Sequence, residues 1–218
     1  MAFKGASKYV RKERAGAVAS ARMAGNPPMT TRRRTLLGIV ATLAVAGGAR
    51  AEPVMTDDGF YREPWFIESF LDMPADLAAA HEHGKHFAVM WELRGCPYCR
   101  DTHLINFARP DVTAFVRDHF DILQLNVLGS LKVTDFDGEV LTEKQLAAKY
   151  GVHFTPTIQF FEGTAESLKV LSGQQREAIR IPGYLRPDDF LDVFRYVAQR
   201  GDSGKTFREF LDSKRSAG

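Results

Sequence analysis

The only two cysteines of this 218-residue chain, Cys96 and Cys99, stand where an apolar strand is expected to give way to a helix. Residues 87–91 form a short continuous apolar run, which is typical of a buried central strand. Residues 96–108 can form a helix, which the Arg109-Pro110 pair interrupts. A closely spaced cysteine pair at such a junction constrains the fold and the chemistry more than any other feature of the sequence.

The start of a helix favours a reactive thiolate at Cys96. The first helical turn has unpaired backbone N–H groups and a positive dipole end, which stabilise an anion. Pro97 suits the first helical position, and Cys99 falls on the same face within disulfide reach. Arg94 and Arg100 flank the pair and are expected to add to this stabilisation. Cys96 would attack a partner's disulfide and Cys99 would resolve the mixed disulfide, although the reverse direction is equally allowed.

This sequence gives little support to two other functions of a C-x-x-C pair, a structural disulfide and a c-type haem site. A structural disulfide across four residues would contribute only about 2 kcal/mol, on the loop-entropy scale. Residues 52–218 are enough for a sizeable core and hardly need so small a contribution. A c-type haem needs a histidine directly after the second cysteine, and Arg100 excludes it.

A metal site stays open as an alternative. A zinc site needs two ligands beyond the cysteines, and the chain has no other cysteine. His103 lies four residues after Cys99, on the same expected helix. The non-enzymatic alternative is therefore an exported copper- or zinc-binding module that uses Cys96, Cys99 and His103. The interpretation as a thiol–disulfide oxidoreductase involves no metal ion.

The first fifty-one residues have the order of an export signal. Residues 32–34 are three arginines, residues 36–46 are apolar, and Ala49-Arg50-Ala51 offers the small residues that a signal peptidase reads. An apolar helix of this length rises only about 16 Å, about half a bilayer core, so no stable membrane anchor is expected. We expect cleavage near Ala51-Glu52 and a periplasmic location, with the twin-arginine and Sec routes both open.

The charge of the chain divides at the same place. Residues 1–51 carry a net charge of +9 and residues 52–218 one of −7, although the whole chain sums to +2. The basic part is the part expected to be removed, so it is no argument for a nucleic-acid partner. We expect a soluble, acidic mature protein that is a monomer and binds no nucleic acid.

Strands and helices alternate along the mature chain, which predicts an α/β layered fold. Residues 52–69 are predicted to be a lead-in segment and residues 70–213 a single domain. Residues 135–138 carry a turn signal, expected in a surface excursion. The expected strands are residues 87–91, 122–127, 158–161 and 178–181, and the expected helices are residues 74–83, 96–108, 110–119, 142–150 and 187–199.

Together with the cysteine pair, the run Thr155-Pro156-Thr157 before an expected strand resembles the thioredoxin superfamily. In that family the proline after the threonine is cis and faces the disulfide. The resemblance implies a thioredoxin-like fold, with a central mixed sheet flanked by helices. It also implies that Thr155 and Pro156 line a groove for client proteins, and that Pro156 keeps metal off the thiols. No cofactor is implied beyond the redox-active disulfide Cys96–Cys99.

Within the superfamily, residues 70–194 are most similar to the periplasmic thioredoxins of sulfur-oxidation gene clusters, the SoxW type. This similarity implies a soluble reductase that receives electrons from a membrane thiol transporter of the CcdA/DsbD kind. Its clients would be periplasmic cysteine proteins, including carriers used in thiosulfate oxidation. The runs that carry the similarity are residues 90–99, 121–126, 133–138 and 150–157.

Two positions depart from ordinary thioredoxins. Gly95 replaces the tryptophan before the first cysteine, and Met90 replaces the buried acid six residues before it. A proton acceptor for Cys99 must therefore come from another residue or from water. Glu92 is the first candidate, against the alternative of a solvent-facing glutamate at the strand end. His103 is the second, against a place on the polar surface of the helix.

Other thioredoxin-like enzymes fit the spacing less well. Pro97-Tyr98 also occurs in glutaredoxins and some periplasmic isomerases, and Tyr98 is expected to tune the pair and touch clients. A glutaredoxin is usually cytosolic, and the export signal counts against it. The 44 residues from Glu52 to Cys96 and the 55 between Cys99 and Thr155 are too few for the extra domains of DsbC-type isomerases and DsbA-type oxidases. We expect a thioredoxin-like reductant of protein disulfides, with a periplasmic isomerase or oxidase as the alternative.

Overall fold

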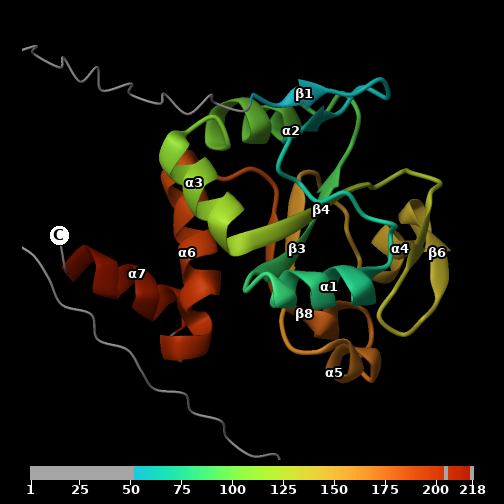
Figure 1. The fold of residues 1–218 in the computed structure, drawn as a ribbon. Coiled ribbons are helices and arrows are strands. Elements are labelled where there is room, and N and C mark those ends of the chain that lie inside the picture. Colours follow the sequence, from blue (N-terminus) through green and yellow to red (C-terminus); the bar gives the residue numbers. More distant parts are fainter. Residues whose placement is uncertain (1–51, 204–205, 217–218) are drawn as a thin grey trace, which may run out of the picture. The chain divides into compact units, whose positions relative to one another are not determined.

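The structure, a computed structural model, describes residues 52–203 and 206–216 (Figure 1). The expected export signal, residues 1–51, lies outside the described residues. In the part of the chain that the structure describes, no helix is long and apolar enough to cross a membrane.

Strands and helices alternate along the described chain, as the sequence predicted. The elements are β1 (Val54–Met55), β2 (Tyr61–Arg62), α1 (Met73–Glu82), β3 (His86–Glu92), α2 (Pro97–Asp101), the π-helical turn η1 (Thr102–Asn106), α3 (Pro110–His119), β4 (Phe120–Asn126), β5 (Lys132–Thr134), β6 (Val140–Thr142), α4 (Glu143–Lys149), β7 (Thr157–Phe161), α5 (Ala165–Lys169), the 3₁₀ turn η2 (Gly173–Arg176), β8 (Glu177–Pro182), α6 (Pro187–Ser203) and α7 (Phe207–Ser216).

A four-stranded mixed sheet forms the centre of the domain. Its strand order is β4-β3-β7-β8, with β3 parallel to β4 and β7 antiparallel to both of its neighbours. In this register Met90 of β3 lies between Gln124 of β4 and Ile158 of β7. The expected α/β fold with a central mixed sheet flanked by helices is confirmed.

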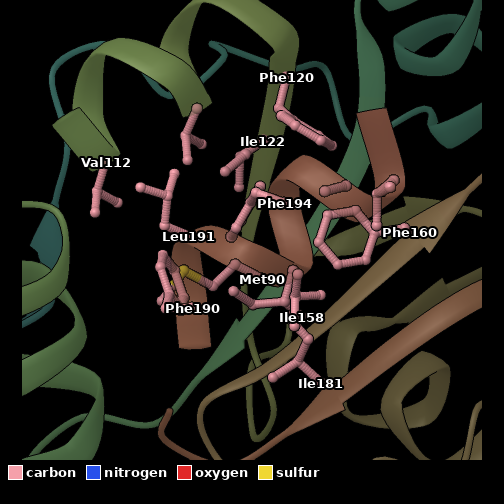
Figure 2. Packing of buried hydrophobic residues seen from close by; sticks show 14 of the residues in the cluster. Met90, Val112, Phe120, Ile122, Ile158, Phe160, Ile181, Phe190, Leu191 and Phe194 are labelled. Atoms are coloured by element: carbon pink, nitrogen blue, oxygen red, sulfur yellow. The ribbon is translucent and has the colours of Figure 1, made fainter. Parts of the chain in front are cut away.

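Both faces of the sheet are buried, because side chains of β3 alternate between two apolar layers. Phe87, Val89 and Trp91 pack with residues of α1, α4 and α5. Ala88 and Met90 face the opposite way and pack with residues of α3 and α6. Figure 2 shows this second layer, in which the phenylalanines of α6 lie against the side chains of β3, β4 and β7. A strand buried on both faces explains the continuous apolar run that precedes the cysteines.

The helix after the cysteines differs from the expected one. It was expected to run through residues 96–108, but α2 ends at Asp101 and a π-helical turn follows. In this wider turn the N–H of Phe107 donates to the carbonyl of Thr102 at 2.9 Å. Single π turns inside helices are frequent at functional sites. This one carries His103.

The turn at residues 135–138 is present, but the expectation of a surface excursion is wrong for its first two residues. Asp135 and Phe136 are buried between the short strands β5 and β6. The guanidinium of Arg176, itself buried, lies 2.6 Å from the Asp135 carboxylate and 2.8 Å from that of Asp137. A carboxylate can enter the interior here because a buried cation pairs with it.

The segment before α1 packs closely against the rest of the domain. Phe66 is buried in the layer under α3 and α6, and the ring of Trp65 meets that of Phe107 edge-on at 5.3 Å. The N–H of Ile67 donates to the carbonyl of Ile122 at 3.1 Å. Glu63, directly after β2, is buried as well. This segment therefore reaches the interior near the cysteines.

Candidate active site

Cys96 is the N-cap of α2. Its backbone is extended, and the N–H of Cys99 donates to its sulfur at 3.1 Å. Pro97 occupies the first helical position, as expected, where its missing N–H breaks no helical hydrogen bond. The sulfur of Cys96 thus takes the place of a capping oxygen at a helix start and accepts a backbone N–H there.

The two cysteines differ in exposure. Cys96 is half-buried, Cys99 is 4% exposed, and both are free thiols. Burial raises the pKa of the Cys99 thiol, and its hydrogen bond with Cys96 and the nearby charge of Glu92 raise it further. Cys99 therefore keeps its proton at neutral pH and can act as a nucleophile only if a neighbouring group accepts that proton.

The loop before β7 faces Cys96. The Thr155-Pro156 peptide bond is cis, as the resemblance implied. The Cys96 thiol donates to the Thr155 carbonyl at 3.5 Å, and the Thr155 hydroxyl lies 3.5 Å from the Cys96 sulfur. The N–H of Gly183 donates to the Pro156 carbonyl at 2.7 Å and ties this loop to the end of β8. The structure therefore brings Thr155 and Pro156 to the cysteine pair.

Glu92 is an interior residue. It is 1% exposed and lies on the same face of β3 as Met90, two residues closer to the cysteines. One carboxylate oxygen accepts a hydrogen bond from His103 Nε2 at 2.7 Å, and the other accepts one from Gln124 Nε2 at 2.8 Å. The alternative of a solvent-facing glutamate is therefore wrong, because these two donors make burial of the carboxylate possible.

His103 lies between two buried carboxylates. It is 0% exposed, with Nε2 at 2.7 Å from Glu92 and Nδ1 at 2.9 Å from Glu63. Burial disfavours the imidazolium, but the two carboxylates outweigh burial and raise the pKa of His103 to about 9. The alternative of a polar helix surface is wrong, because both ring nitrogens find acceptors inside the protein.

This arrangement weakens the metal alternative. An imidazolium whose two nitrogens both donate has no lone pair left for a metal ion. The side chain of His103 is thus committed to Glu63 and Glu92, and does not join Cys96 and Cys99 in a ligand set. Among residues 52–203 and 206–216, no three His, Cys, Asp or Glu side chains are grouped so that they could hold a metal ion.

Two members of this network, Glu63 and Gln124, were not identified from the sequence. Glu63 lies in the expected lead-in segment, 33 residues before Cys96, and Gln124 lies within an expected strand. A signal was present, because Glu63 is surrounded in the sequence by four aromatic residues. Such a run indicates a packed segment, and an acid inside a packed segment needs a partner. The four are Phe60, Tyr61, Trp65 and Phe66.

The two arginines that flank the pair each make contacts with other parts of the protein. The Arg100 guanidinium hydrogen-bonds the neighbouring Asp101 at 2.8 and 3.0 Å, so that its charge is offset. Arg94 is exposed, and its stem lies along the β1–β2 turn at Gly59, where a Cβ would come within 2.9 Å of it. Gly59 also has a φ of +83°, which a glycine adopts easily.

Two hollows flank Cys96. On one side a cavity of about 250 Å³ lies between the cysteines and the β1–β2 segment, and Figure 1 shows β1 beside α2. On the other side an open groove of about 620 Å³ is lined by Tyr98, Phe154, Thr155 and Tyr184. Tyr98 is exposed and stacks on Tyr184, with ring centroids 6.0 Å apart. Exposed aromatic side chains beside a reactive sulfur are suited to contact with another protein.

Thiol–disulfide exchange is the chemistry that these cysteines can perform, and a thioredoxin-like domain with such a close pair is that of a thiol–disulfide oxidoreductase. Residues 73–198 match the family model of the thioredoxin-like domain, and the chain belongs to that family. Comparison with curated proteins gives no match.

Solved structures with a similar fold include two described as thioredoxins or thioredoxin-fold proteins. A thioredoxin-fold protein from Helicobacter pylori is 17% identical, with a TM-score of 0.48, over 71% of this chain and 94% of that one. A thioredoxin from Thermus thermophilus is 24% identical, with a TM-score of 0.45, over 61% and 88%. The C-terminal domain of DsbD from Neisseria meningitidis is 15% identical, with a TM-score of 0.38, over 56% and 88%.

Proposed function

We propose that this protein is an exported reductant of protein disulfides, in which Cys96 attacks the client and Cys99 resolves the mixed disulfide. The observation that carries the proposal is the asymmetry of the pair. Cys96 is half-buried at a helix start and faces Thr155, whereas Cys99 is buried near the Glu92 carboxylate. An accessible nucleophile and a protected resolving thiol are what a two-step exchange requires.

In the first step the Cys96 thiolate forms a bond to one sulfur of a client disulfide. The client S–S bond breaks, and the second client sulfur leaves as a thiolate. In the second step Cys99 gives its proton to Glu92 and forms a bond to the Cys96 sulfur, and the remaining client sulfur leaves as a thiolate. The client gains two electrons, and the protein loses two as the Cys96–Cys99 disulfide forms.

Glu92 is the proposed proton acceptor because it lines the same cavity as Cys96 and Cys99, and because its charge acts on the Cys99 thiol. His103 and Gln124 each use one lone pair of the carboxylate, which leaves others to receive a proton. In this assignment His103 keeps its own proton and acts as the counter-ion of Glu92. His103, the second candidate proton acceptor, thus supports Glu92 and does not accept the proton itself.

The client is proposed to lie across Thr155 and Pro156, with its side chains in the groove beside Tyr98. The oxidised protein would regain its electrons from a membrane thiol transporter of the CcdA/DsbD kind, as the resemblance to SoxW-type thioredoxins implies. Clients in a sulfur-oxidation system are proposed on the same resemblance. A periplasmic isomerase or oxidase differs from this proposal in reduction potential and in the direction of electron flow.

Export rests on the order of basic, apolar and small residues in residues 32–51. We propose that the mature protein starts at Glu52 and works in the periplasm, where thiols need an active reductant. Fractionation of the producing cells, followed by N-terminal sequencing, tests this proposal. Protein that stays in the cytoplasm with its N-terminus uncut would refute it.

The function is tested by reduction of insulin with dithiothreitol as the electron donor, using the full-length protein. We expect catalysis by wild type, none by Cys96→Ser, and a reduction potential near about −270 mV, the value of a thioredoxin. A potential near about −120 mV would show an oxidant instead. Wild-type protein without activity that retains stoichiometric copper or zinc would support the metal-binding alternative.

A further inference from the structure

The segment before α1 takes part in the buried network at two points. Glu63 accepts a hydrogen bond from His103 Nδ1 at 2.9 Å, and the Tyr61 carbonyl accepts one from Gln124 Nε2 at 2.7 Å. His103 and Gln124 are the same two residues that donate to the oxygens of Glu92. Residues 61–63 precede the stretch 73–198 that matches the family model, so the acid site is completed from outside that stretch.

We propose that Glu63 is a positioning residue for the resolving step, which holds His103 as the cation that keeps Glu92 ionised beside Cys99. This inference rests on the proposed function, because it concerns the proton that Cys99 loses when it attacks Cys96. Glu63 does not touch the cysteines in this scheme. It acts through His103, and no bond other than hydrogen bonds changes at Glu63.

The charges of the network explain why a second carboxylate is needed. A buried imidazolium paired with only one carboxylate has one negative charge fewer to offset the cost of its burial, which favours loss of the Nδ1 proton. A neutral His103 could still donate from Nε2 to Glu92, but it would no longer supply a positive charge. The Glu92 carboxylate would then be buried without a counter-ion and would tend to hold a proton of its own. A protonated Glu92 cannot accept the proton of Cys99.

Few other titratable groups face this site. The groups around His103 are Glu63 from the segment after β2, Glu92 from β3 and the ring of Tyr61 from β2, whose centroid lies 6.2 Å from the imidazole. Its other ring neighbours, Phe66 and Phe107, are uncharged. On the side of α2, Glu92 faces Cys99, which is hydrogen-bonded to Cys96. A change at Glu63 therefore reaches the cysteines through His103 and Glu92.

The test follows the reaction of the reduced full-length protein with an aromatic disulfide, dithiobis-nitrobenzoate, by stopped flow. Attack by Cys96 releases the first coloured thiolate and resolution by Cys99 releases the second, so two phases separate the two steps. In Glu63→Gln we expect the second phase to slow on the order of tenfold at pH 7, and to recover toward wild type as the pH rises. The first phase should stay close to wild type.

A matched control removes a similar charge from the same segment. Glu68 is 92% exposed on its side chain and pairs with Arg62, so Glu68→Gln should leave both phases unchanged. An NMR titration of the His103 ring measures directly how Glu63 affects the protonation of His103. Its midpoint should be lower in Glu63→Gln than in wild type and unchanged in Glu68→Gln. If Glu63→Gln does not fold, Glu63→Asp should show a slower second phase and a lower His103 midpoint, both to a smaller extent.

An unchanged pH profile of the second phase in the Glu63 variant would overturn the inference, whichever way the His103 midpoint moves. In that case the wild-type second phase remains, and the proposed function stands. A wild-type protein that shows no second phase at any pH would instead refute the resolving role of Cys99, and the inference would fall with it. The two failures are therefore distinguishable in one experiment.

Discussion

Glu92 and His103 form an ion pair in the interior, with 2.7 Å between a carboxylate oxygen and Nε2, and neither side chain reaches solvent. The two residues come from opposite sides of the cysteine pair in sequence, one at the end of β3 and one in the π turn η1. Met90 stands where the resemblance places the buried acid of ordinary thioredoxins, and we propose that Glu92, two residues nearer the cysteines, takes over its role. His103 is the counter-ion of this buried acid.

Removal of the proposed proton acceptor should affect one step only. In Glu92→Gln the resolution of a mixed disulfide should slow by about 100-fold at pH 7, the lower range for loss of a general base. Attack by Cys96 should be little changed, because its sulfur accepts hydrogen bonds from the Cys99 N–H and the Thr155 hydroxyl and none from Glu92. The two-phase release of nitrobenzoate thiolate measures both steps. Glu166→Gln, on the exposed surface of α5, is the matched control, and equal rates in both variants would contradict the assignment.

The same ion pair should make the stability of the fold depend on pH. The pKa of His103 is raised from 6.5 to about 9, so its contribution is complete below pH 6.5 and is lost as the pH rises through 9. The shift corresponds to a contribution on the order of 3 kcal/mol to the free energy of unfolding. Urea titrations at pH 6 and pH 10 measure it. We expect His103→Gln to remove most of the difference, and an equally steep decline in the variant would show that other groups cause it.

The buried pair of Arg176 and Asp135 should matter more for stability than pairs at the surface. In Arg176→Met the Asp135 carboxylate loses its buried cation and keeps only Lys149, whose Nζ lies 2.6 Å away. We therefore expect a loss of about 3 kcal/mol in the free energy of unfolding, the lower end for breaking a buried pair. Arg186 pairs with Asp189 at 3.4 Å on the surface, and Arg186→Met should cost less than about 1 kcal/mol. Urea unfolding curves of both variants provide the comparison. Similar losses in both variants would mean that the buried Arg176 pair does not stabilise the β5–β6 turn more than a surface pair would.

The groove beside Cys96 should contribute to the recognition of proteins but not to the chemistry. Phe154 is 67% exposed and lines this groove with Tyr98 and Tyr184. Phe154→Ser should therefore raise the KM for insulin, while its reaction with the small nitrobenzoate disulfide stays close to wild type. Phe70→Ser changes a fully exposed phenylalanine that does not line this groove and serves as the control. A KM that rises equally in both variants would refute the specific role of the groove.

The layered fold and the cysteine site were predictable because they depend on local patterns. The apolar run before Cys96 predicted a central strand. The helices expected at residues 74–83, 110–119 and 142–150 begin within one residue of α1, α3 and α4. The cysteines at the start of α2 and the loop at Thr155 also follow from short motifs. In each case residues close in sequence determine the result.

The buried charges could not be predicted in the same way. Whether Glu92 lies in water or in the interior depends on His103, Gln124 and Glu63, which are 11, 32 and 29 positions away from it along the chain. Burial of Asp135 likewise depends on Arg176, 41 positions further on. A charged residue enters a protein core only when a partner meets it there, and a single sequence does not state which distant residues meet.

The most direct test of the account is the capture of its mixed disulfide. Full-length Cys99→Ala and Cys96→Ala, with the remaining cysteine reduced, are each mixed with native insulin whose disulfides are intact. Mass spectrometry then identifies the cysteine that carries the adduct. Cys99→Ala should accumulate insulin disulfide-bonded to Cys96, since the resolving thiol is gone, and Cys96→Ala should accumulate none. An adduct through Cys99 in Cys96→Ala, or no adduct in either variant, would contradict the central claim that Cys96 is the nucleophile of a thiol–disulfide oxidoreductase.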